Sequence, residues 1–134
     1  MPKVRLVRKE IISAAHQLHC DSLSPSENNA LFGKCANLHG HNYEISVVIE
    51  GDVDPLTGLV MNFDELKSII HTHVIRKIDH KNLNADVDEF KSLNPTAEHI
   101  AIVIWSWLQP SLTDLLVEVQ VTESEKNTAI YRGN

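Results

Sequence analysis

Hydrophobic and polar residues alternate in four segments of the chain, and this alternation predicts four β-strands. Residues 4–13 alternate aliphatic with charged side chains, as a half-buried strand does. Residues 42–50 and 115–122 also place their hydrophobic side chains at every second position. Residues 129–132 are a short fourth candidate, and the turn-forming residues 123–127 would join the last two strands as a hairpin.

In two of these strands the hydrophobic positions share one parity and therefore one face. They are Tyr43, Ile45, Val47 and Ile49 in the second strand and Leu115, Val117, Val119 and Val121 in the third.

Between the two pairs of strands, the hydrophobic spacing changes to three and four residues, which predicts two helices. Residues 63–74 and residues 97–108 both show this spacing. Asn94 or Thr96 would cap the start of the second helix, and Pro110 would mark its end.

The order strand, strand, helix, helix, strand, strand predicts an α+β fold with a four-stranded antiparallel sheet and both helices on one face. No repeat or linker divides the chain, so residues 1–134 are expected to form a single domain. Residues 20–38 and 79–93 form connections longer than the geometry requires, and long loops inside a compact domain are commonly functional or disordered.

Composition restricts the function classes. The 134 residues include 12 basic and 18 acidic side chains, and the net charge of −6 argues against a nucleic-acid partner. No segment approaches the roughly 18 consecutive apolar residues that a membrane span needs. The first residues resemble neither a signal peptide nor a transit peptide, so we expect a cytoplasmic protein with two free thiols.

Three of the eight histidines form a candidate metal site. His39 and His41 immediately precede the second strand, where residues two apart point to the same face. An antiparallel pairing could place His16, at the end of the first strand, beside them. Three neutral imidazoles with an open fourth position match a catalytic zinc site, whereas an isolated His-x-His motif can also arise by coincidence.

Other histidines serve as internal controls for this interpretation. His71 and His73 have the same spacing but lie on a predicted helix, where residues two apart do not face each other, so we predict surface positions for both. We assign no metal role to His19 or His99.

Two further groups could carry chemistry. Cys35 lies beside Lys34 and close to the histidine pair, which favours a thiolate able to act as base or nucleophile. Cys35 could instead be a fourth zinc ligand that closes the site, or an inert thiol, which is the interpretation that we favour for Cys20. Asp79 precedes His80, whose imidazole could shuttle protons or simply be a solvated residue in a turn.

Seven motifs in order resemble those of the 6-pyruvoyltetrahydropterin synthase and 6-carboxytetrahydropterin synthase family, and the resemblance covers nearly the whole chain. The motifs are ISAAHQL at 12–18, LFGKC at 31–35, HGHNY at 39–43, DPLTG at 54–58, DHKNLN at 79–84, NPTAE at 94–98, and TE at 122–123 ahead of IYRG at 130–133.

The resemblance implies the tunnelling fold (T-fold), in which trimers close their sheets into a β-barrel and two trimers stack into a homohexamer. Active sites would then form at subunit boundaries. A barrel also removes the exposed sheet edges that a lone four-stranded domain would present.

The resemblance also implies a reaction. His16, His39 and His41 would hold Zn²⁺, which would bind the side-chain hydroxyls of 7,8-dihydroneopterin triphosphate and ease deprotonation of the adjacent C–H. Elimination of triphosphate would give 6-pyruvoyltetrahydropterin, an intermediate of tetrahydrobiopterin-type synthesis. Cys35 would take the proton as a thiolate.

His80, with Asp79, would carry protons for elimination and tautomerisation, although adjacent residues on a regular element do not easily hydrogen-bond each other.

The remaining site residues implied by the resemblance concern substrate binding. Glu123 would anchor the pterin, because a carboxylate accepts two parallel N–H donors from the amino-pyrimidinone edge. Thr96 and Glu98 would face the pocket, or Thr96 would only cap its helix. Lys34 and Lys81 are candidates for holding the triphosphate.

Three departures leave alternatives open. The short spacing from Cys35 to His39 resembles the 6-carboxytetrahydropterin synthases of queuosine and deazapurine synthesis, which release acetaldehyde and triphosphate, although we favour the pyruvoyl product. Ile12 replaces the aromatic residue usual in the family, and Ala97 replaces a threonine. A zinc-stabilised interaction module closed by Cys35, or a pterin-binding protein without catalysis, are the non-enzymatic alternatives.

Overall fold

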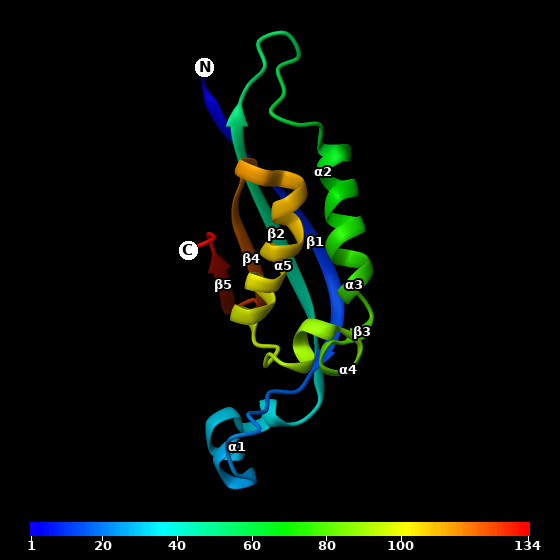
Figure 1. The fold of residues 1–134 in the computed structure, drawn as a ribbon, viewed down its shortest axis with the longest axis vertical. Helices are drawn as coiled ribbons and strands as arrows, with labels where there is room; N and C mark the ends of the chain where they lie inside the picture. The colour runs from blue at the N-terminus through cyan, green and yellow to red at the C-terminus, as the bar shows by residue number, and fades with distance from the viewer.

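The computed structural model describes residues 1–134 and places one layer of helices against one layer of sheet (Figure 1). The strands are β1 (Lys3–His16), β2 (His39–Asp52), β3 (Lys81–Asn82), β4 (Leu116–Ser124) and β5 (Asn127–Tyr131). The helices are α1 (Pro25–Phe32), α2 (Phe63–Ile70), α3 (Arg76–Ile78), α4 (Leu83–Asp86) and α5 (Ala97–Leu112). Short 3₁₀ turns cover Gly33–Ala36, Asp88–Lys91 and Thr113–Leu115, and a π-helical turn covers His71–Ile75.

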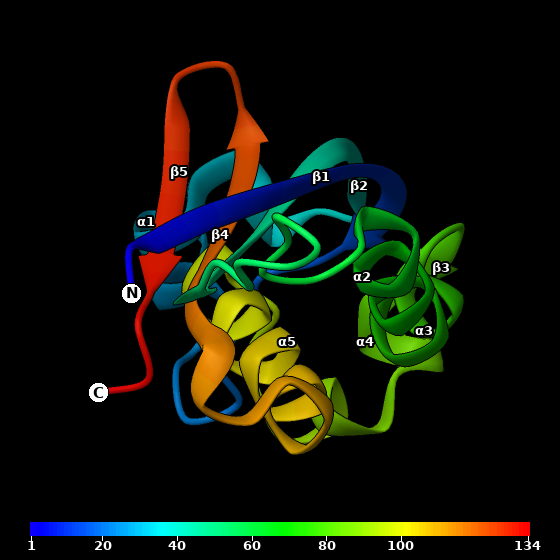
Figure 2. The same ribbon diagram turned by 90° about the horizontal axis from the view of Figure 1, so that it is seen from above.

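The α+β class and the placement of both long helices on one face are confirmed, because α5 and the α2–α3 segment lie on the same side of the sheet (Figure 2). The prediction of a four-stranded antiparallel sheet is wrong. The sheet has five strands in the order β3-β1-β2-β4-β5, and β3 runs parallel to β1. β3 is only two residues long, too short to produce an alternation that could be recognised in the sequence.

The core lies between the sheet and the helices. Tyr43, Ile45, Val47 and Ile49 of β2 have no exposed surface, which confirms the predicted inward parity of that strand. The helices contribute a matching set of buried aliphatic side chains: Leu66, Ile70, Val74, Ile78, Ile100, Ile104 and Leu108. Each fully buried aliphatic side chain contributes about 1.5–3 kcal/mol through removal of apolar surface from water.

The face predicted for β4 is only half correct. Val119 and Val121 are buried as expected, but Leu116 is buried in place of Leu115 and Val117. The cause is a bulge, because Val48 pairs with Glu118 while the next residue of β2 pairs with Leu116. One extra residue in a strand reverses the faces of the residues beyond it.

Both predicted helices extend further than their patterns suggested. The first passes through the π-helical turn and ends at Ile78, and α5 continues past Pro110 to Leu112. Pro110 lies in the last turn, so its missing N–H removes one hydrogen bond, and the N–H of Thr113 still donates to the carbonyl of Gln109.

The two long connections contain secondary structure that the sequence analysis did not predict. Residues 79–93 include β3 and α4, and residues 20–38 include α1 at one end of the molecule (Figure 1). Ser24 and Glu27 form a capping box around Pro25 at the start of α1, a signal that was readable in the sequence.

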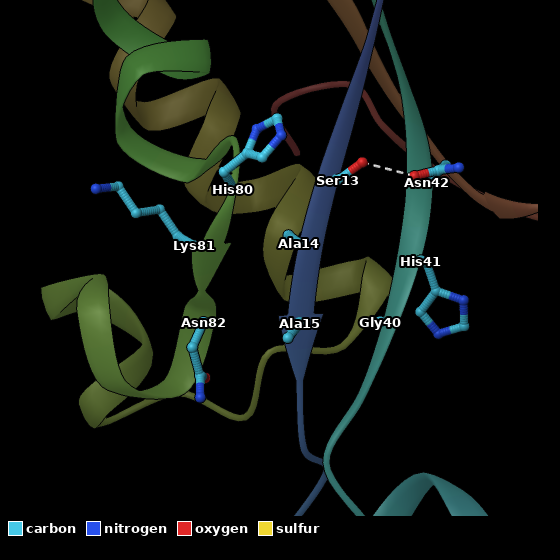
Figure 3. Close-up of a pocket in the computed structure, with 9 residues that line it drawn as sticks. All are labelled: Ser13, Ala14, Ala15, Gly40, His41, Asn42, His80, Lys81 and Asn82. Atoms are coloured by element: carbon cyan, nitrogen blue, oxygen red, sulfur yellow. Dashed lines mark hydrogen bonds between the residues drawn. The ribbon is translucent and has the colours of Figure 1, made fainter.

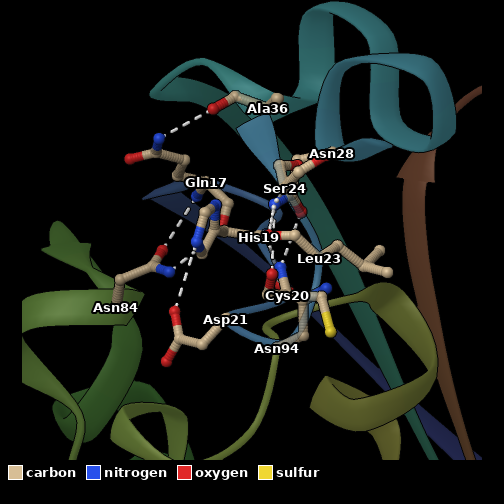
Figure 4. A network of polar contacts seen from close by, with 10 residues as sticks. All are labelled: Gln17, His19, Cys20, Asp21, Leu23, Ser24, Asn28, Ala36, Asn84 and Asn94. Carbon is tan, nitrogen blue, oxygen red and sulfur yellow. Dashed lines mark hydrogen bonds and ion pairs between the residues drawn. The ribbon is translucent and has the colours of Figure 1, made fainter. Parts of the chain in front are cut away.

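The segment that carries α1 is held by a single buried amide. Asn28 is 3% exposed, and its Oδ1 accepts a hydrogen bond from the N–H of Cys20 at 2.8 Å. Its Nδ2 donates to the carbonyls of Cys20 and Leu23 (Figure 4). These hydrogen bonds join α1 to the residues that follow β1.

The structure contains no helix that is long and apolar enough to cross a membrane.

The predicted surface positions of His71 and His73 are only partly correct, because each residue is half-buried and contacts another element. His71 Nε2 donates to Glu10 Oε1 of β1 at 2.9 Å, and His73 Nε2 lies 3.2 Å from Ser111 Oγ of α5. The group of candidate ligand atoms consists of His16, His39 and His41 and includes neither His71 nor His73.

Glu10 joins the first helix to the sheet. Its Oε1 also accepts hydrogen bonds from Arg8 Nε at 3.0 Å and Nη2 at 2.8 Å. Burial acts to raise the pKa of the Glu10 carboxyl, but hydrogen bonds from Arg8 and His71 outweigh it and hold that pKa below its usual value.

We therefore expect Glu10→Gln to lower the free energy of unfolding at pH 7 by about 1 kcal/mol, because three N–H donors, two of Arg8 and one of His71, lose a charged acceptor. Since the folded pKa lies below the unfolded one, this contribution is present above pH 4.5 and is lost as the pH falls through the folded value. Urea unfolding at pH 7 and pH 3 measures this effect. The free energy of unfolding should fall more between pH 7 and pH 3 in the unmodified protein than in the variant.

Glu44→Gln is the matched control, because Glu44 of β2 forms a longer, more exposed ion pair of 3.7 Å with Lys9 of β1. If both substitutions lowered the free energy of unfolding equally, Glu10 would contribute no more to stability than an exposed ion pair.

Candidate functional site

Three imidazoles meet where β1 ends and β2 begins. In the antiparallel ladder His16 pairs with His39, and His41 pairs with Ala14. One ligand nitrogen of each of the three histidines lies within 4.8 Å of the other two, and the ring centroids are 4.5 to 5.2 Å apart. The predicted convergence of His16, His39 and His41, which we call the histidine trio, is confirmed.

Hydrogen bonds to backbone carbonyls orient the rings of two members of the trio. His16 Nδ1 lies 2.7 Å from the carbonyl oxygen of Pro95, and His39 Nδ1 lies 2.7 Å from that of Asn37. A carbonyl only accepts, so Nδ1 carries the proton in both rings and Nε2 presents its lone pair.

The Nε2 atoms of His39 and His41 are buried and have no hydrogen-bond partner. Buried polar atoms are rarely left unsatisfied, so two such atoms side by side indicate a missing partner. Neutral imidazoles whose other nitrogen donates to a carbonyl are the form in which histidine binds metals. The residues of the trio thus fit a divalent cation.

The protonation of His16 agrees with this role. Its side chain has no exposed surface, and burial lowers the pKa of His16 most strongly. The carbonyl of Pro95 acts in the opposite direction, while the nearby His39 and His41 lower the pKa further. His16 is therefore neutral at pH 7, as a metal ligand must be.

Tyr43 completes the buried side of the site, although the sequence analysis did not assign it a role. Its Oη lies 3.1 Å from His16 Nε2, and its ring packs edge-on against His41 at 5.4 Å. Burial, followed by the charges of Glu123 and Cys35, raises the pKa of Tyr43 well above its usual value, so the hydroxyl stays protonated. Its parity with His39 and His41 in β2 was the available signal.

Glu123 lies beside the trio, at the end of β4. Its Oε1 is 3.6 Å from His41 Nε2. Glu123 and Glu98 line one cavity of about 410 Å³, together with Lys126 of the β4–β5 turn. The structure therefore brings the predicted carboxylates Glu98 and Glu123 to a common cavity.

Thr96 has the capping role that was one of its two predicted roles. Its Oγ1 accepts a hydrogen bond from the N–H of His99 at 3.1 Å at the start of α5. His99 Nδ1 donates a hydrogen bond to the carbonyl of Asn94, and His19 forms an exposed ion pair with Asp21. Neither histidine joins the trio.

Cys35 is half-buried on the 3₁₀ turn that precedes β2, next to the exposed Lys34. Both cysteines are free thiols, as predicted. The thiol of Cys35 does not belong to the group of ligand atoms that the trio forms. The geometry therefore gives no support to a closed four-ligand site.

The side chains of Asp79 and His80 lie close together although the two residues are adjacent in sequence, with His80 Nδ1 3.0 Å from Asp79 Oδ1. The left-handed backbone of His80, at φ 61°, makes this contact possible. The pair is fixed to β1, because the N–H of Ser13 donates to Asp79 Oδ1 and the carbonyl of Ser13 accepts from the N–H of His80.

The Asp79–His80 pair does not belong to the group of ligand atoms formed by the trio of its own chain, although His80 and His41 line one open cavity. The His80 side chain is 81% exposed, and its ring does not point toward that of His41 (Figure 3). With Lys81, it lines an open cavity of about 490 Å³ along β1 and β2.

Comparisons with known proteins match this chain to one family over nearly its whole length. The family profile described as 6-pyruvoyl tetrahydropterin synthase matches residues 5–134. A 6-pyruvoyl tetrahydrobiopterin synthase of Dictyostelium discoideum is 48% identical over 130 residues, which cover 97% of this chain and 96% of that protein. The solved structure of Caenorhabditis elegans 6-pyruvoyl tetrahydropterin synthase matches with a TM-score of 0.95 at 39% identity, covering 100% of this chain and 98% of that one.

A relative named for a different activity also matches this chain. A putative 6-carboxy-5,6,7,8-tetrahydropterin synthase of Archaeoglobus fulgidus is 36% identical over 99 residues, covering 74% of this chain and 79% of that protein.

We expect a divalent cation to stabilise the fold through the trio, because a ligand that binds only the folded state adds about 2.7 kcal/mol at 100 times its Kd. Thermal unfolding with and without Zn²⁺ measures the effect. His39→Ala should abolish the increase in Tm, whereas His19→Ala, which removes an exposed histidine outside the trio, should keep it. An increase that survives in His39→Ala would place the cation elsewhere.

Proposed function

Because this chain belongs to the 6-pyruvoyl tetrahydropterin synthase family, we propose that it is a zinc-dependent lyase that converts 7,8-dihydroneopterin triphosphate to 6-pyruvoyltetrahydropterin and triphosphate. The resemblance found in the seven sequence motifs is thereby confirmed. The observation that carries the proposal is the trio of convergent imidazoles, two of them with buried unpartnered Nε2 atoms, beside the carboxylate of Glu123.

His16, His39 and His41 would hold the zinc ion. Three neutral histidines leave a fourth position open, as in catalytic rather than structural zinc sites. When bound, the ion supplies Lewis-acid polarisation of the side-chain hydroxyls of the substrate.

Glu123 would hold the pterin ring. A carboxylate accepts two parallel hydrogen bonds from the amino and ring N–H groups of a pterin. Because Glu123 is 3.6 Å from His41 Nε2, a pterin bound there would have its side chain next to the trio. Glu98 lines the same cavity, and Thr96 orients the start of the helix that carries it.

Cys35 would act as the base. Its thiolate would take the proton from the side-chain carbon next to the polarised hydroxyl, and the resulting electron pair would expel triphosphate. Cys35 lies on the 3₁₀ turn four residues before His39 of the trio, which supports placing the thiol near the reacting atoms.

His80 and Asp79 would carry protons during elimination and tautomerisation. In a single chain the His80 side chain is exposed and its ring does not point toward that of His41, so we propose that the pair serves the site of a neighbouring copy in a homohexamer. The short edge strand β3 and the edge strand β5 are free to pair in such an assembly, in which the sheets would close into a barrel. Lys81, next to His80, and Lys34, next to Cys35, are the cations proposed for the triphosphate.

The second candidate is a 6-carboxytetrahydropterin synthase that releases acetaldehyde and triphosphate. The relative from Archaeoglobus fulgidus and the short spacing between Cys35 and His39 favour it. Higher identity to 6-pyruvoyl tetrahydrobiopterin synthases, over a larger share of the chain, makes it the less favoured one.

Incubation of the purified protein and Zn²⁺ with 7,8-dihydroneopterin triphosphate, followed by mass spectrometry, decides between these activities. We expect triphosphate and 6-pyruvoyltetrahydropterin, and no product after treatment with a chelator. Acetaldehyde and the carboxy pterin would establish the second candidate, and a zinc-loaded protein that forms neither product would refute both.

We expect Cys35→Ala to reduce kcat by about 10² to 10⁴, because it removes the base but no metal ligand. Bound zinc, measured by atomic absorption, should be unchanged. Cys20→Ala is the matched control, because Cys20 is the other free thiol and lies outside the group of ligand atoms. Loss of zinc from Cys35→Ala would show that Cys35 is a ligand.

A further inference from the structure

The hydroxyl of Tyr43 depends on one atom of the proposed metal site. Tyr43 is completely buried, and its only hydrogen-bond partner is His16 Nε2, at 3.1 Å. Because His16 Nδ1 donates to the carbonyl of Pro95, Nε2 must be the acceptor and the phenol the donor.

Side-chain packing does not account for this hydroxyl. The next inward-facing residues of β2, Ile45 and Val47, are aliphatic and equally buried, so the surroundings accept apolar side chains. A buried hydroxyl destabilises the fold unless it is hydrogen-bonded, and phenylalanine would fill nearly the same volume without that requirement. The hydroxyl of Tyr43 is therefore kept for its contact with His16.

The contact uses the lone pair that a metal ion needs. A neutral imidazole has a single lone pair in the plane of its ring, on the nitrogen that carries no proton. In His16 this is Nε2, which belongs to the group of ligand atoms of the trio and also accepts the Tyr43 hydroxyl. One lone pair cannot serve a full hydrogen bond and a coordinate bond at the same time.

We infer that Tyr43 is a positioning residue that sets the metal affinity of the trio by competing with the metal ion for the lone pair of His16 Nε2. The inference rests on the proposed metal site. The hydrogen bond holds the His16 ring with Nε2 directed into the trio, and it must break before His16 can coordinate. Tyr43 thus weakens metal binding and leaves a free donor inside the site once metal is bound.

The first test compares Zn²⁺ affinity, measured by competition with a chromogenic chelator, in the unmodified protein, Tyr43→Phe and Tyr131→Phe. Tyr43→Phe removes one neutral hydrogen bond, so we expect its Kd for Zn²⁺ to fall by about two- to tenfold. Tyr131→Phe is the matched control, because Tyr131 packs against Trp105 at 5.5 Å and takes no part in the trio. An unchanged or higher Kd in Tyr43→Phe would overturn the inference.

The second test leaves Tyr43 in place, so it does not depend on the folding of Tyr43→Phe. The chain has two tyrosines, so Tyr131→Phe contains Tyr43 as its only tyrosine. Ultraviolet resonance Raman spectra of this variant report the hydrogen bonding of that phenol. Addition of Zn²⁺ should change the intensity ratio of the tyrosine doublet, because the hydroxyl loses His16 as its acceptor.

The outcomes separate this inference from the proposed function. A metal-bound protein whose tyrosine doublet is unchanged would refute the role of Tyr43 while leaving the zinc site intact. If the unmodified protein binds no Zn²⁺, the metal site itself fails, and the inference fails with it.

Discussion

The register between β1 and β2 is the constraint on which the site depends. Fourteen consecutive pairs join the two strands, and the pair at the far end is His16 with His39. A strand exposes alternate side chains on opposite faces, so a slip of one residue would turn the members of the trio on one strand away from those on the other. The same slip would expose Tyr43 and the aliphatic residues of β2 that form the core. Burial of the core and assembly of the trio are therefore consequences of one register.

Much of this arrangement could be predicted from local patterns. The parity of β2 predicted which of its side chains are buried, and the His-x-His spacing at its start placed two imidazoles on one face. Features set by distant parts of the chain could not be predicted in this way. β3 exists only because two residues meet β1 at Ala14 and Ala15, and the bulge in β4 depends on its pairing with β2.

The site features that the sequence did not predict also depend on contacts between distant parts of the chain. The role of Tyr43 depends on His16, 27 residues earlier in the chain, so the parity that Tyr43 shares with His39 and His41 places it on their face but does not reveal its partner. Asp79 and His80 were recognised as residues of interest, but their contact depends on a left-handed backbone that no residue type at position 80 demands. His71 was assigned to the surface because residues two apart on a helix do not face each other, and that spacing could not reveal its partner Glu10 on a different element. Local spacing identified most of the chemical groups, and tertiary contacts determined what each of them bonds to.

The backbone at His80 also affects how this position can change during evolution. A side chain larger than that of glycine in the left-handed region costs on the order of 1 kcal/mol, and asparagine and glycine are the replacements that relieve it. Selection for stability alone would therefore tend to remove the imidazole. A descendant in which the side chain at position 80 has no function should therefore drift toward Asn or Gly there.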